Sequence, residues 1–319
     1  MMDAIGGYFG LELRRDRHYH NGALRLNTAR NAFEYVLSAR GYRKVYLPYY
    51  TCEAMIQPVC RLGLEYGFYH IDEKLEPTDL PDLGNGEAFL YTNYFGLKQE
   101  CVLSLSARYG EHLIVDNAQA FYAEPVKGLD TFYSARKFFG VPDGAYLYTE
   151  AVLDGTLEPD QSSARCAHLL KRIELGAEGG YEDFHMAENS LDNRPIRQMS
   201  VLTEAMMAGI DYGEARERRL ANYKILESAL GEVNRLHLPL EKGAVPVAYP
   251  FMAESSALKR LLISNRIYVA TYWPNVLHWC QVGDWEHALT ERVCFLPTDQ
   301  RYGEEEMRRI VATVFRLGF

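Results

Sequence analysis

The chain contains a lysine, a carboxylate and a hydroxyl in an order that suits chemistry on an aldehyde cofactor. Lys137 follows Ser134 in a Ser-x-x-Lys turn, and Asp116 ends an apolar run upstream. A lysine amine in apolar surroundings forms an imine with an aldehyde, and a carboxylate keeps a pyridine nitrogen protonated. A hydroxyl helps to bind a phosphate group. The three residues together therefore predict a site for pyridoxal 5'-phosphate (PLP), with Lys137 as its catalytic residue.

Each of these residues also has an ordinary structural interpretation. A lysine between aromatic residues commonly covers apolar surface with its stem while its ammonium reaches water. An aspartate at the end of a strand is often a helix cap or a turn residue. The order Asp116, Gln119, Ser134 and Lys137 favours a shared cofactor site over separate structural roles.

Composition and charge limit the class of protein. The 319 residues are 48% hydrophobic and 24% charged, which is an ordinary globular composition with room for two domains. The net charge of −9 disfavours binding to nucleic acid. No apolar run reaches the roughly 20 residues that span a bilayer, and residues 1–7 lack the regions of a signal peptide. We therefore expect a cytoplasmic protein with no nucleic-acid partner and no membrane association.

The cysteines and histidines show no metal-binding pattern. The six cysteines lack C-x-x-C and zinc-finger spacing, and the nine histidines form no H-E-x-x-H pair. We expect free thiols in a reducing compartment and no metal site.

Short apolar strands alternate with amphipathic helices over about the first 150 residues. This alternation predicts a mostly parallel sheet with helices on both faces. Ligands of such sheets bind beyond the carboxyl ends of the strands, where Asp116 and the tyrosines Tyr50 and Tyr94 are expected. The predicted strands are 44–47, 65–71, 88–92, 112–115, 131–133 and 145–148, and the predicted helices between them are 29–39, 52–62 and 99–109.

The second half of the chain has a different pattern. Residues 154–197 are polar and weakly patterned, with a helix expected at 164–175. A long helical region follows at 201–230, in which Leu202, Met206 and Ile210 share a face. We divide the chain into a large α/β domain at 1–200, a linking helix at 201–231 and a small α+β domain at 232–319. In the small domain we expect strands at 246–250 and 267–270 and helices at 256–264 and 304–317.

Several of these motifs, in their order, resemble a known family. Residues 45–48 followed by Thr51, the segment Asp116-Asn-Ala-Gln119 with Lys137 downstream, and residues 197–200 before the long helix carry the resemblance. Leu296-Pro297 before the closing helix adds to it. From about residue 25 to 316 the chain resembles the DegT/DnrJ/EryC1/StrS sugar aminotransferases, which are fold-type I PLP-dependent enzymes. It looks like a divergent member.

The resemblance implies a role for each candidate residue. Lys137 is implied as the imine-forming lysine and transamination base, Asp116 as the partner of the pyridinium nitrogen, and Gln119 as a neighbour of the ring or its phenolic oxygen. It also implies a homodimer whose site draws on both subunits. The other implied residues are Ser134, Thr28, Ala29 and Arg30 near the phosphate, Cys52 and Tyr50 beside the ring, and Arg197, Asn193 and Tyr94 toward substrate or the partner subunit.

The chain departs from the family pattern at four places. Phe132 replaces a serine five residues before the lysine, and Asp143-Gly-Ala145 replaces a pair of glycines. Cys52 stands where a ring-stacking residue is usual, and residues 26–31 lack a Gly-Thr pair. Ser134 is therefore the remaining candidate for the phosphate hydroxyl.

The leading interpretation is a PLP-dependent aminotransferase that moves an amino group from an amino acid, such as glutamate, to a keto-sugar nucleotide. The main alternative is a non-catalytic relative that keeps the fold for binding or regulation. A sugar dehydratase is disfavoured because such relatives replace the lysine. A nicotinamide enzyme is disfavoured because no G-x-G-x-x-G follows the first strand.

Overall fold

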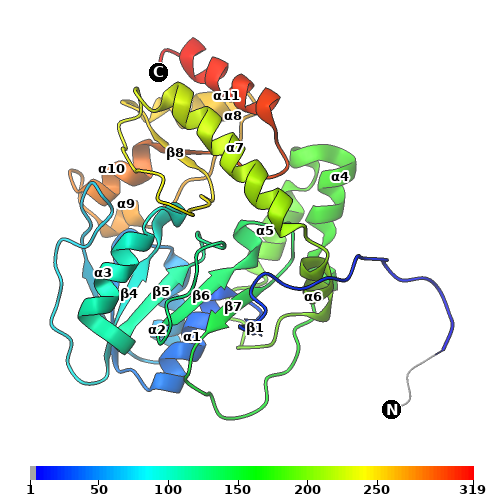
Figure 1. Ribbon diagram of the computed structural model, residues 1–319, viewed down its shortest axis with the longest axis vertical. Helices are drawn as coiled ribbons and strands as arrows, with labels where there is room; N and C mark the ends of the chain where they lie inside the picture. The colour runs from blue at the N-terminus through cyan, green and yellow to red at the C-terminus, as the bar shows by residue number, and fades with distance from the viewer. Residues whose placement is uncertain (1–4) are drawn as a thin grey trace.

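A computed structural model describes residues 5–319. Residues 1–4, which open the segment considered above for a signal peptide, lie outside the described part. Figure 1 shows a twisted central sheet with helices on its faces and a C-terminal unit packed beyond one edge of the strands. No helix within residues 5–319 is both long enough and apolar enough to cross a membrane.

A seven-stranded sheet organises the first half of the chain. Its strand order is β1-β7-β6-β5-β4-β2-β3. The pairs from β3 through β2, β4 and β5 to β6 are parallel, whereas β7 pairs antiparallel with β6 and β1. The predicted mostly parallel α/β fold is thus confirmed. The strands are β1 (Leu24–Leu26), β2 (Lys44–Pro48), β3 (Glu65–Tyr69), β4 (Glu87–Thr92), β5 (Leu113–Asn117), β6 (Asp130–Ser134) and β7 (Ala145–Tyr148).

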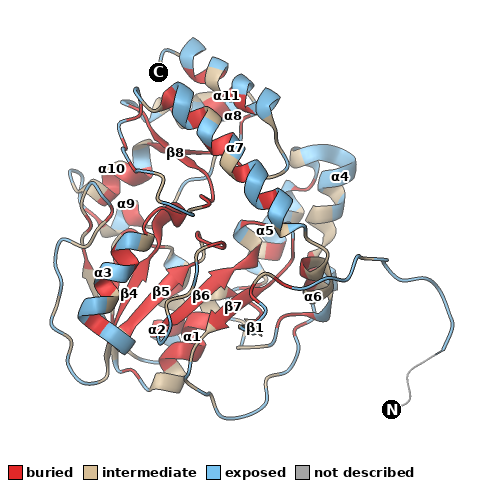
Figure 2. Cartoon of the chain, viewed as in Figure 1, coloured by how far each residue is buried: buried red, intermediate tan, exposed pale blue. Residues whose placement is uncertain are grey.

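Alternation along the strands creates two apolar faces. Side chains such as Val45 and Phe132 point to one face, where α1 (Ala29–Arg40) and α2 (Ile56–Arg61) cover them. Side chains such as Phe89 and Val115 point to the other face, toward α3 (Gln99–Tyr109) and the C-terminal unit. Figure 2 shows the buried strands between partly exposed helices. The predicted helices 29–39 and 99–109 agree closely with α1 and α3.

Short 3-10 helices complete several connections. The 3-10 helices are η1 (Glu53–Met55), η2 (Tyr94–Gly96), η3 (Gly110–His112), η4 (Ala135–Lys137) and η5 (Ser163–Arg165). The helix predicted at 52–62 begins as η1 and continues as α2.

The weakly patterned residues 154–197 contain more helix than expected. They form α4 (Ala167–Gly179) and α5 (Tyr181–Asn189). Gly176 has a φ of 78° and interrupts α4, so its continuous part, 167–175, agrees with the helix expected at 164–175. The turn of helix after Gly176 and α5 were not predicted.

The long helical region predicted at 201–230 is wrong as one element. It consists of α6 (Val201–Ala208) and α7 (Tyr212–Leu230). Gly209 ends α6, and the Asp211 side chain accepts a hydrogen bond from the Glu214 N–H at 3.0 Å to cap α7. Ile210 therefore lies between the helices and does not share a face with Leu202 and Met206.

The C-terminal unit combines a two-stranded antiparallel sheet with four helices. The strand predicted at 246–250 is found slightly later in the chain, as β8 (Tyr249–Met252). It pairs with β9 (Val293–Leu296), which was not predicted. The predicted strand 267–270 is not formed; within it only Ala270 makes an isolated bridge, to Phe295. The helices are α8 (Ala257–Ser264), α9 (Val276–Trp279), α10 (Trp285–Arg292) and α11 (Glu304–Arg316), of which α9 and α10 were not predicted.

Candidate active site

Lys137 lies at the end of η4, directly after β6. The loop is closed by a hydrogen bond from the Ala135 N–H to the Gly144 carbonyl at 3.0 Å. Lys137 is an exposed residue, yet desolvation by the surrounding protein lowers its pKa, and the charge of Arg136 lowers it further. Solvent reaches this residue while protein groups surround it closely, and we call its surroundings, which include Cys52, Asp116 and Tyr272, the recess. A lowered pKa increases the fraction of nucleophilic neutral amine.

Asp116 is buried at the carboxyl end of β5 and faces the same recess. Burial raises its pKa to about 6, while a hydrogen bond from the Ala118 N–H to Oδ1 (2.8 Å) and the charge of Lys137 lower it. The mutual electrostatic effect of Asp116 and Lys137 places them within reach of one another. A buried carboxylate of this kind is stabilised by any cation placed beside it.

Aromatic and thiol groups form the walls around Lys137. The Lys137 Nζ lies 5.6 Å from the centre of the Tyr272 ring, and Cys52 is close enough to influence the pKa of the lysine. Tyr50 is fully buried behind them, with its ring centroid 4.9 Å from that of Trp273. Tyr272 and Trp273 were missed by sequence analysis because they come from the C-terminal unit, far away along the chain, and no local motif marks them.

Gln119 occupies the turn that follows β5. Its Oε1 accepts a hydrogen bond from the Phe95 N–H at 3.1 Å. Its Nε2 is buried and makes no hydrogen bond with the described part of the chain, and the same holds for the Tyr50 hydroxyl. Buried donors of this kind are costly unless a ligand or water satisfies them.

The N-terminus of α1 lies against the lysine loop, as the phosphate hypothesis requires. The Gly144 N–H donates to the Asn27 carbonyl at 2.6 Å. Ser134 shares the α1 side of β6 with Phe132, since side chains two apart point to the same face. The Thr28 hydroxyl accepts from the Asn31 N–H at 3.1 Å and donates to Asn31 Oδ1 at 2.7 Å. Thr28 therefore caps the helix, while Ala29 is partly buried beside it.

Two arginines bring positive charge to this end of α1. Arg30 pairs with Asp192 at 2.7 Å, and Arg136 pairs with Glu188 on α5. The pKa of Arg136 is lowered to about 10, mainly by burial, while the charge of Asp143 opposes this shift and the charges of Arg165 and Arg30 add to it. Arg30 is thus close enough to Arg136 to affect its pKa. Arg136 was not among the predicted residues, although its place directly before Lys137 could have indicated it. Such paired cations suit an anionic group.

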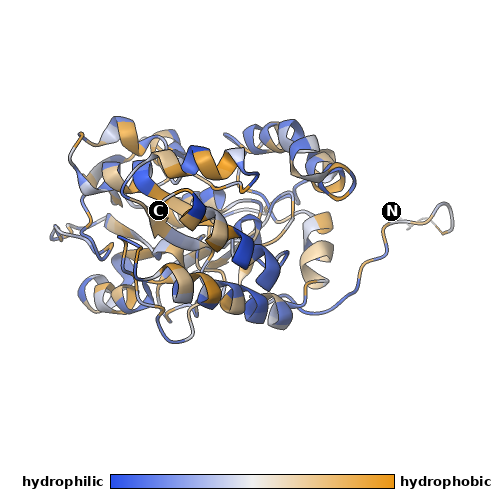
Figure 3. Ribbon diagram, turned by 90° about the horizontal axis from the view of Figure 1, so that it is seen from above, coloured by the Kyte–Doolittle hydropathy of each residue, from blue (hydrophilic) through white to orange (hydrophobic). Residues whose placement is uncertain are grey.

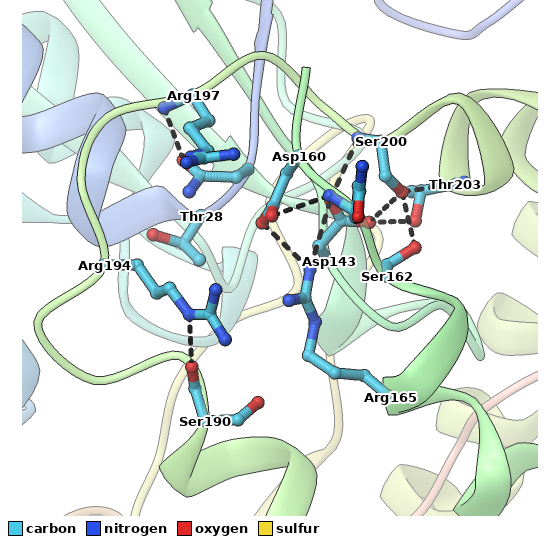
Figure 4. A network of polar contacts seen from close by, with 12 residues as sticks. Thr28, Asp143, Asp160, Ser162, Arg165, Ser190, Arg194, Arg197, Ser200 and Thr203 are labelled. Atoms are coloured by element: carbon cyan, nitrogen blue, oxygen red, sulfur yellow. Dashed lines mark hydrogen bonds and ion pairs between the residues drawn. The ribbon is translucent and has the colours of Figure 1, made fainter. Parts of the chain in front are cut away.

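Asp143 anchors the turn that follows the lysine loop (Figure 4). Its carboxylate is fully buried and accepts hydrogen bonds from the Ser200 N–H (3.0 Å) and Oγ (2.8 Å) and from the Thr203 hydroxyl. Burial raises the pKa of Asp143, and these hydrogen bonds oppose the shift. The substitution seen at 143–145 in the sequence thus ties the lysine loop to the start of α6.

A buried ion pair extends this network. Arg165 binds Asp160 at 2.9 Å and lies 4.0 Å from Asp143, and Ser162 contacts the Ser200 hydroxyl at 2.6 Å. Gly144 has a φ of +114°, and a Cβ there would lie 3.0 Å from the Thr203 side chain. Glycine is therefore required at this turn.

The remaining candidate residues, Arg197, Asn193 and Tyr94, lie in three different parts of the structure. The Arg197 main chain exchanges hydrogen bonds with Asn27 at 3.0 and 3.3 Å, which keeps it beside the N-terminus of α1. Asn193 is exposed with a φ of +55°. Tyr94 is fully buried, and its hydroxyl donates to the Tyr50 carbonyl at 2.9 Å. The structure thus brings Arg197 near the predicted phosphate position and places Tyr94 in the core.

Comparisons with known proteins are informative only at the level of structure. No family model matches the sequence, and no curated protein matches it. DesV of S. venezuelae, solved in complex with a ketimine intermediate, has a TM-score of 0.64 and 16% identity, over 92% of this chain and 84% of that one. A DegT DnrJ EryC1 StrS aminotransferase from Brucella abortus gives 0.61 and 16%, over 93% and 86%.

A sugar aminotransferase from Micromonospora echinospora gives a TM-score of 0.61 and 15% identity, over 93% of this chain and 87% of that one. At these identities the likeness establishes the fold. The chain therefore has the fold of the fold-type I PLP aminotransferases, which is the fold expected from its sequence.

Proposed function

We propose that this protein is a PLP-dependent aminotransferase, a divergent member of the DegT/DnrJ/EryC1/StrS family. The proposed reaction moves an amino group from an amino acid, glutamate, to a keto-sugar nucleotide. The observation that carries the proposal is the recess in which Lys137, with a lowered pKa, faces the buried carboxylate of Asp116. The shared fold of sugar aminotransferases supports it.

The residues of the recess fit the cofactor. Asp116 lacks a cationic hydrogen-bond partner in the described chain and would be stabilised by a protonated ring nitrogen. The unsatisfied Nε2 of Gln119 matches an acceptor such as a phenolic oxygen. Cys52 and Tyr272 would flank the ring, and Ser134, Arg30 and Arg136 would receive the phosphate at the start of α1. These assignments agree in charge and in donor type.

Bound PLP supplies an electron sink for a carbanion at the donor Cα. The Nζ of Lys137 would hold the cofactor aldehyde. Once displaced by the donor amine, the same amine would be the base that takes up and returns a proton. The carboxylate of Asp116 would stabilise a protonated ring nitrogen. The walls formed by Tyr50, Tyr272 and Trp273 limit access of water to the reacting atoms.

We further propose a cytoplasmic homodimer whose subunits divide into a catalytic domain at 1–200, a linking segment at 201–231 and a small domain at 232–319. The homodimer is what the resemblance to the family implies. Within one subunit, Tyr272 of the last segment lies beside Lys137 of the first, so the site draws on both of these units.

The proposal is tested by trapping the cofactor. The protein is incubated with PLP, its visible absorbance is recorded, and borohydride reduction is followed by peptide mapping. We expect a reduced adduct on Lys137 and no adduct in Lys137→Ala. Addition of glutamate to the unreduced protein should bleach the visible band. A wild-type protein that shows no band at saturating PLP contradicts the proposal.

A second function has a specific observation in its favour. The Phe132 ring packs 5.9 Å from Phe33 in the α1-side core, so this position offers no hydroxyl to a phosphate. A relative that binds PLP without turnover, and acts in binding or regulation, is consistent with that loss. Such a protein gives the Lys137 adduct, but its visible band persists with every amino acid tried as donor.

A further inference from the structure

The N-terminal segment carries large apolar side chains that the rest of the subunit does not cover. We call residues 5–13 the tail. Within it, Ile5, Tyr8, Phe9 and Leu11 are 102%, 98%, 95% and 74% exposed, and residues 5–17 form no helix or strand. Figures 1 and 3 show the tail extending away from the body. Exposed apolar groups of this size, clustered in one segment, indicate an interaction site.

The base of the tail is fixed to the body at α6. The Asp16 N–H donates to the Ala208 carbonyl at 2.9 Å, at the end of that helix. Arg14 and Asp16 also line a cavity of about 250 Å³ together with Tyr212 at the start of α7. The tail therefore leaves the molecule from a defined position at the end of α6.

A second uncovered apolar surface lies on the same side of the molecule. We call the exposed apolar residues of α4 and α5 the α4–α5 patch. Both helices stand on the side from which the tail projects, as Figure 1 shows. The patch consists of Leu170 (62% exposed), Ile173 (84%), Leu175 (62%), Tyr181 (61%), Phe184 (40%) and Met186 (62%).

The unpaired charges beside the two surfaces are opposite. At the base of the tail Arg14 pairs with Asp16, while Arg15 and Arg17 form no ion pair within the described residues. In α4 and α5, Glu174 and Glu182 likewise form no ion pair within the described residues, while the other three acids pair with Lys171, Arg266 and Arg136. Complementary charge of this kind steers association and fixes register.

We infer that the tail of one subunit lies on the α4–α5 patch of a second copy of the chain. One chain carries both complementary surfaces on one side, which is the requirement of an isologous two-fold interface. Glu188 of α5 pairs with Arg136, the residue before Lys137, so the contact borders the candidate active site. The inference specifies the homodimer of the proposed function, and it does not depend on PLP chemistry.

Matched variants test the two surfaces by light scattering after size exclusion. Tyr8→Ser with Phe9→Ser alters the tail, and Ile173→Ser with Leu175→Ser alters the patch. We expect a dimeric wild type and a dissociation constant raised about tenfold or more in each variant. Leu103→Ser and Val282→Ser are controls at exposed apolar positions elsewhere, 51% and 89% exposed, and should leave the dimer intact. A monomeric wild type, or a tail variant that dimerises as the wild type does, overturns the inference.

Mixing the variants separates contact between chains from contact within a chain. A tail variant keeps an intact patch and a patch variant keeps an intact tail, so a mixed dimer recovers one of the two contacts. We expect mixing to restore part of the dimer that each variant lacks alone. If the tail instead bound the patch of its own chain, mixing would restore nothing, and that result overturns the inference.

A cross-link gives the position of the contact. A photoreactive phenylalanine analogue at position 9 is incorporated into unlabelled chains, which are mixed with ¹⁵N-labelled chains and irradiated. We expect an unlabelled tail peptide joined to a labelled peptide from 167–189. Products confined to one chain, or products that map elsewhere, contradict the inference. The outcome is independent of the borohydride adduct on Lys137, so a failure of one proposal is distinguishable from a failure of the other.

Discussion

Arg219 on α7 donates a hydrogen bond from Nη2 to the main-chain carbonyl of Phe138, the residue that follows Lys137, at 3.0 Å. Its guanidinium also lies 4.5 Å from the centre of the Phe138 ring. Further bonds from Arg219 reach the Val247 carbonyl (3.2 Å) and Gln300 Oε1 (2.9 Å), and Gln300 Nε2 donates to the same Phe138 carbonyl at 2.9 Å. One buried cation thus joins the lysine loop, the long helix and the C-terminal unit.

Replacement of this cation is expected to destabilise the fold. Arg219→Met removes three hydrogen bonds and leaves the buried Val247 carbonyl without its side-chain donor, which lowers the free energy of unfolding by roughly 2–4 kcal/mol. Urea denaturation measures the change. The adjacent Arg218 is exposed, and Arg218→Met should change the stability little. Equal stability of Arg219→Met and Arg218→Met would show that the carbonyl contacts are unimportant.

Asp116→Asn tests the charge beside the cofactor ring. The amide is close in size to the carboxylate but cannot stabilise a protonated ring nitrogen, so we expect the rate of the half-reaction with glutamate to fall on the order of 10²-fold or more. Stopped-flow absorbance measures that rate. The adduct on Lys137 should still form, because the lysine is unchanged. A variant that reacts at the wild-type rate argues against this role for Asp116.

The raised pKa of Asp116 also predicts a pH dependence of stability without cofactor. Its pKa is 3.8 in the unfolded reference and about 6 in the folded protein, so between these values the folded state binds more protons. The contribution of Asp116 to stability therefore falls as pH rises from 4 to 6, by up to about 3 kcal/mol. The difference in unfolding free energy between wild type and Asp116→Asn, measured from pH 4 to 7, isolates this effect. A difference that is flat with pH contradicts the prediction.

The pKa shift of His20 is expected to change stability with pH in the opposite direction to that of Asp116. It is 2% exposed, its Nε2 contacts the Phe121 carbonyl at 2.7 Å, and burial lowers its pKa to about 4. Between pH 6.5 and 4 the unfolded chain binds the proton that the folded chain excludes, so stability falls as pH falls through this window. NMR titration of the imidazole, with His20→Gln to identify its signal, should show a neutral ring at pH 5.5. Protonation near pH 6.5 would refute this expectation.

Gly144→Ala tests the turn anchored by Asp143. An alanine there adopts an unfavourable positive φ and meets the Thr203 side chain at 3.0 Å. We expect a loss of about 1–3 kcal/mol of unfolding free energy. Gly128→Ala is the control, because Gly128 has a φ of +84° but nothing within 4 Å of the added Cβ. The loss at Gly144 in excess of the loss at Gly128 is the steric contribution, and calorimetry measures both.

The sequence could predict the parts of this protein that depend on local pattern. Strand β5 begins with the apolar run Leu-Ile-Val, and β6 contains Phe132 and Tyr133 between polar residues. The places of Asp116 at the end of one strand and of Lys137 shortly after the next follow from this pattern. The first part of α4 was predicted to its end at Leu175, whereas the turn of helix after the non-helical Gly176 was not. Tyr272 and Arg219 were not predicted, since their roles arise from contacts across more than 80 residues of sequence. Such contacts leave no local signal.

Helix α6 is only eight residues long, and its two ends have different neighbours. At one end Ser200 binds Asp143, which holds the turn after Lys137. At the other end the Ala208 carbonyl receives the Asp16 N–H at the base of the tail. One short helix therefore connects the base of the tail with the turn that follows the reactive lysine.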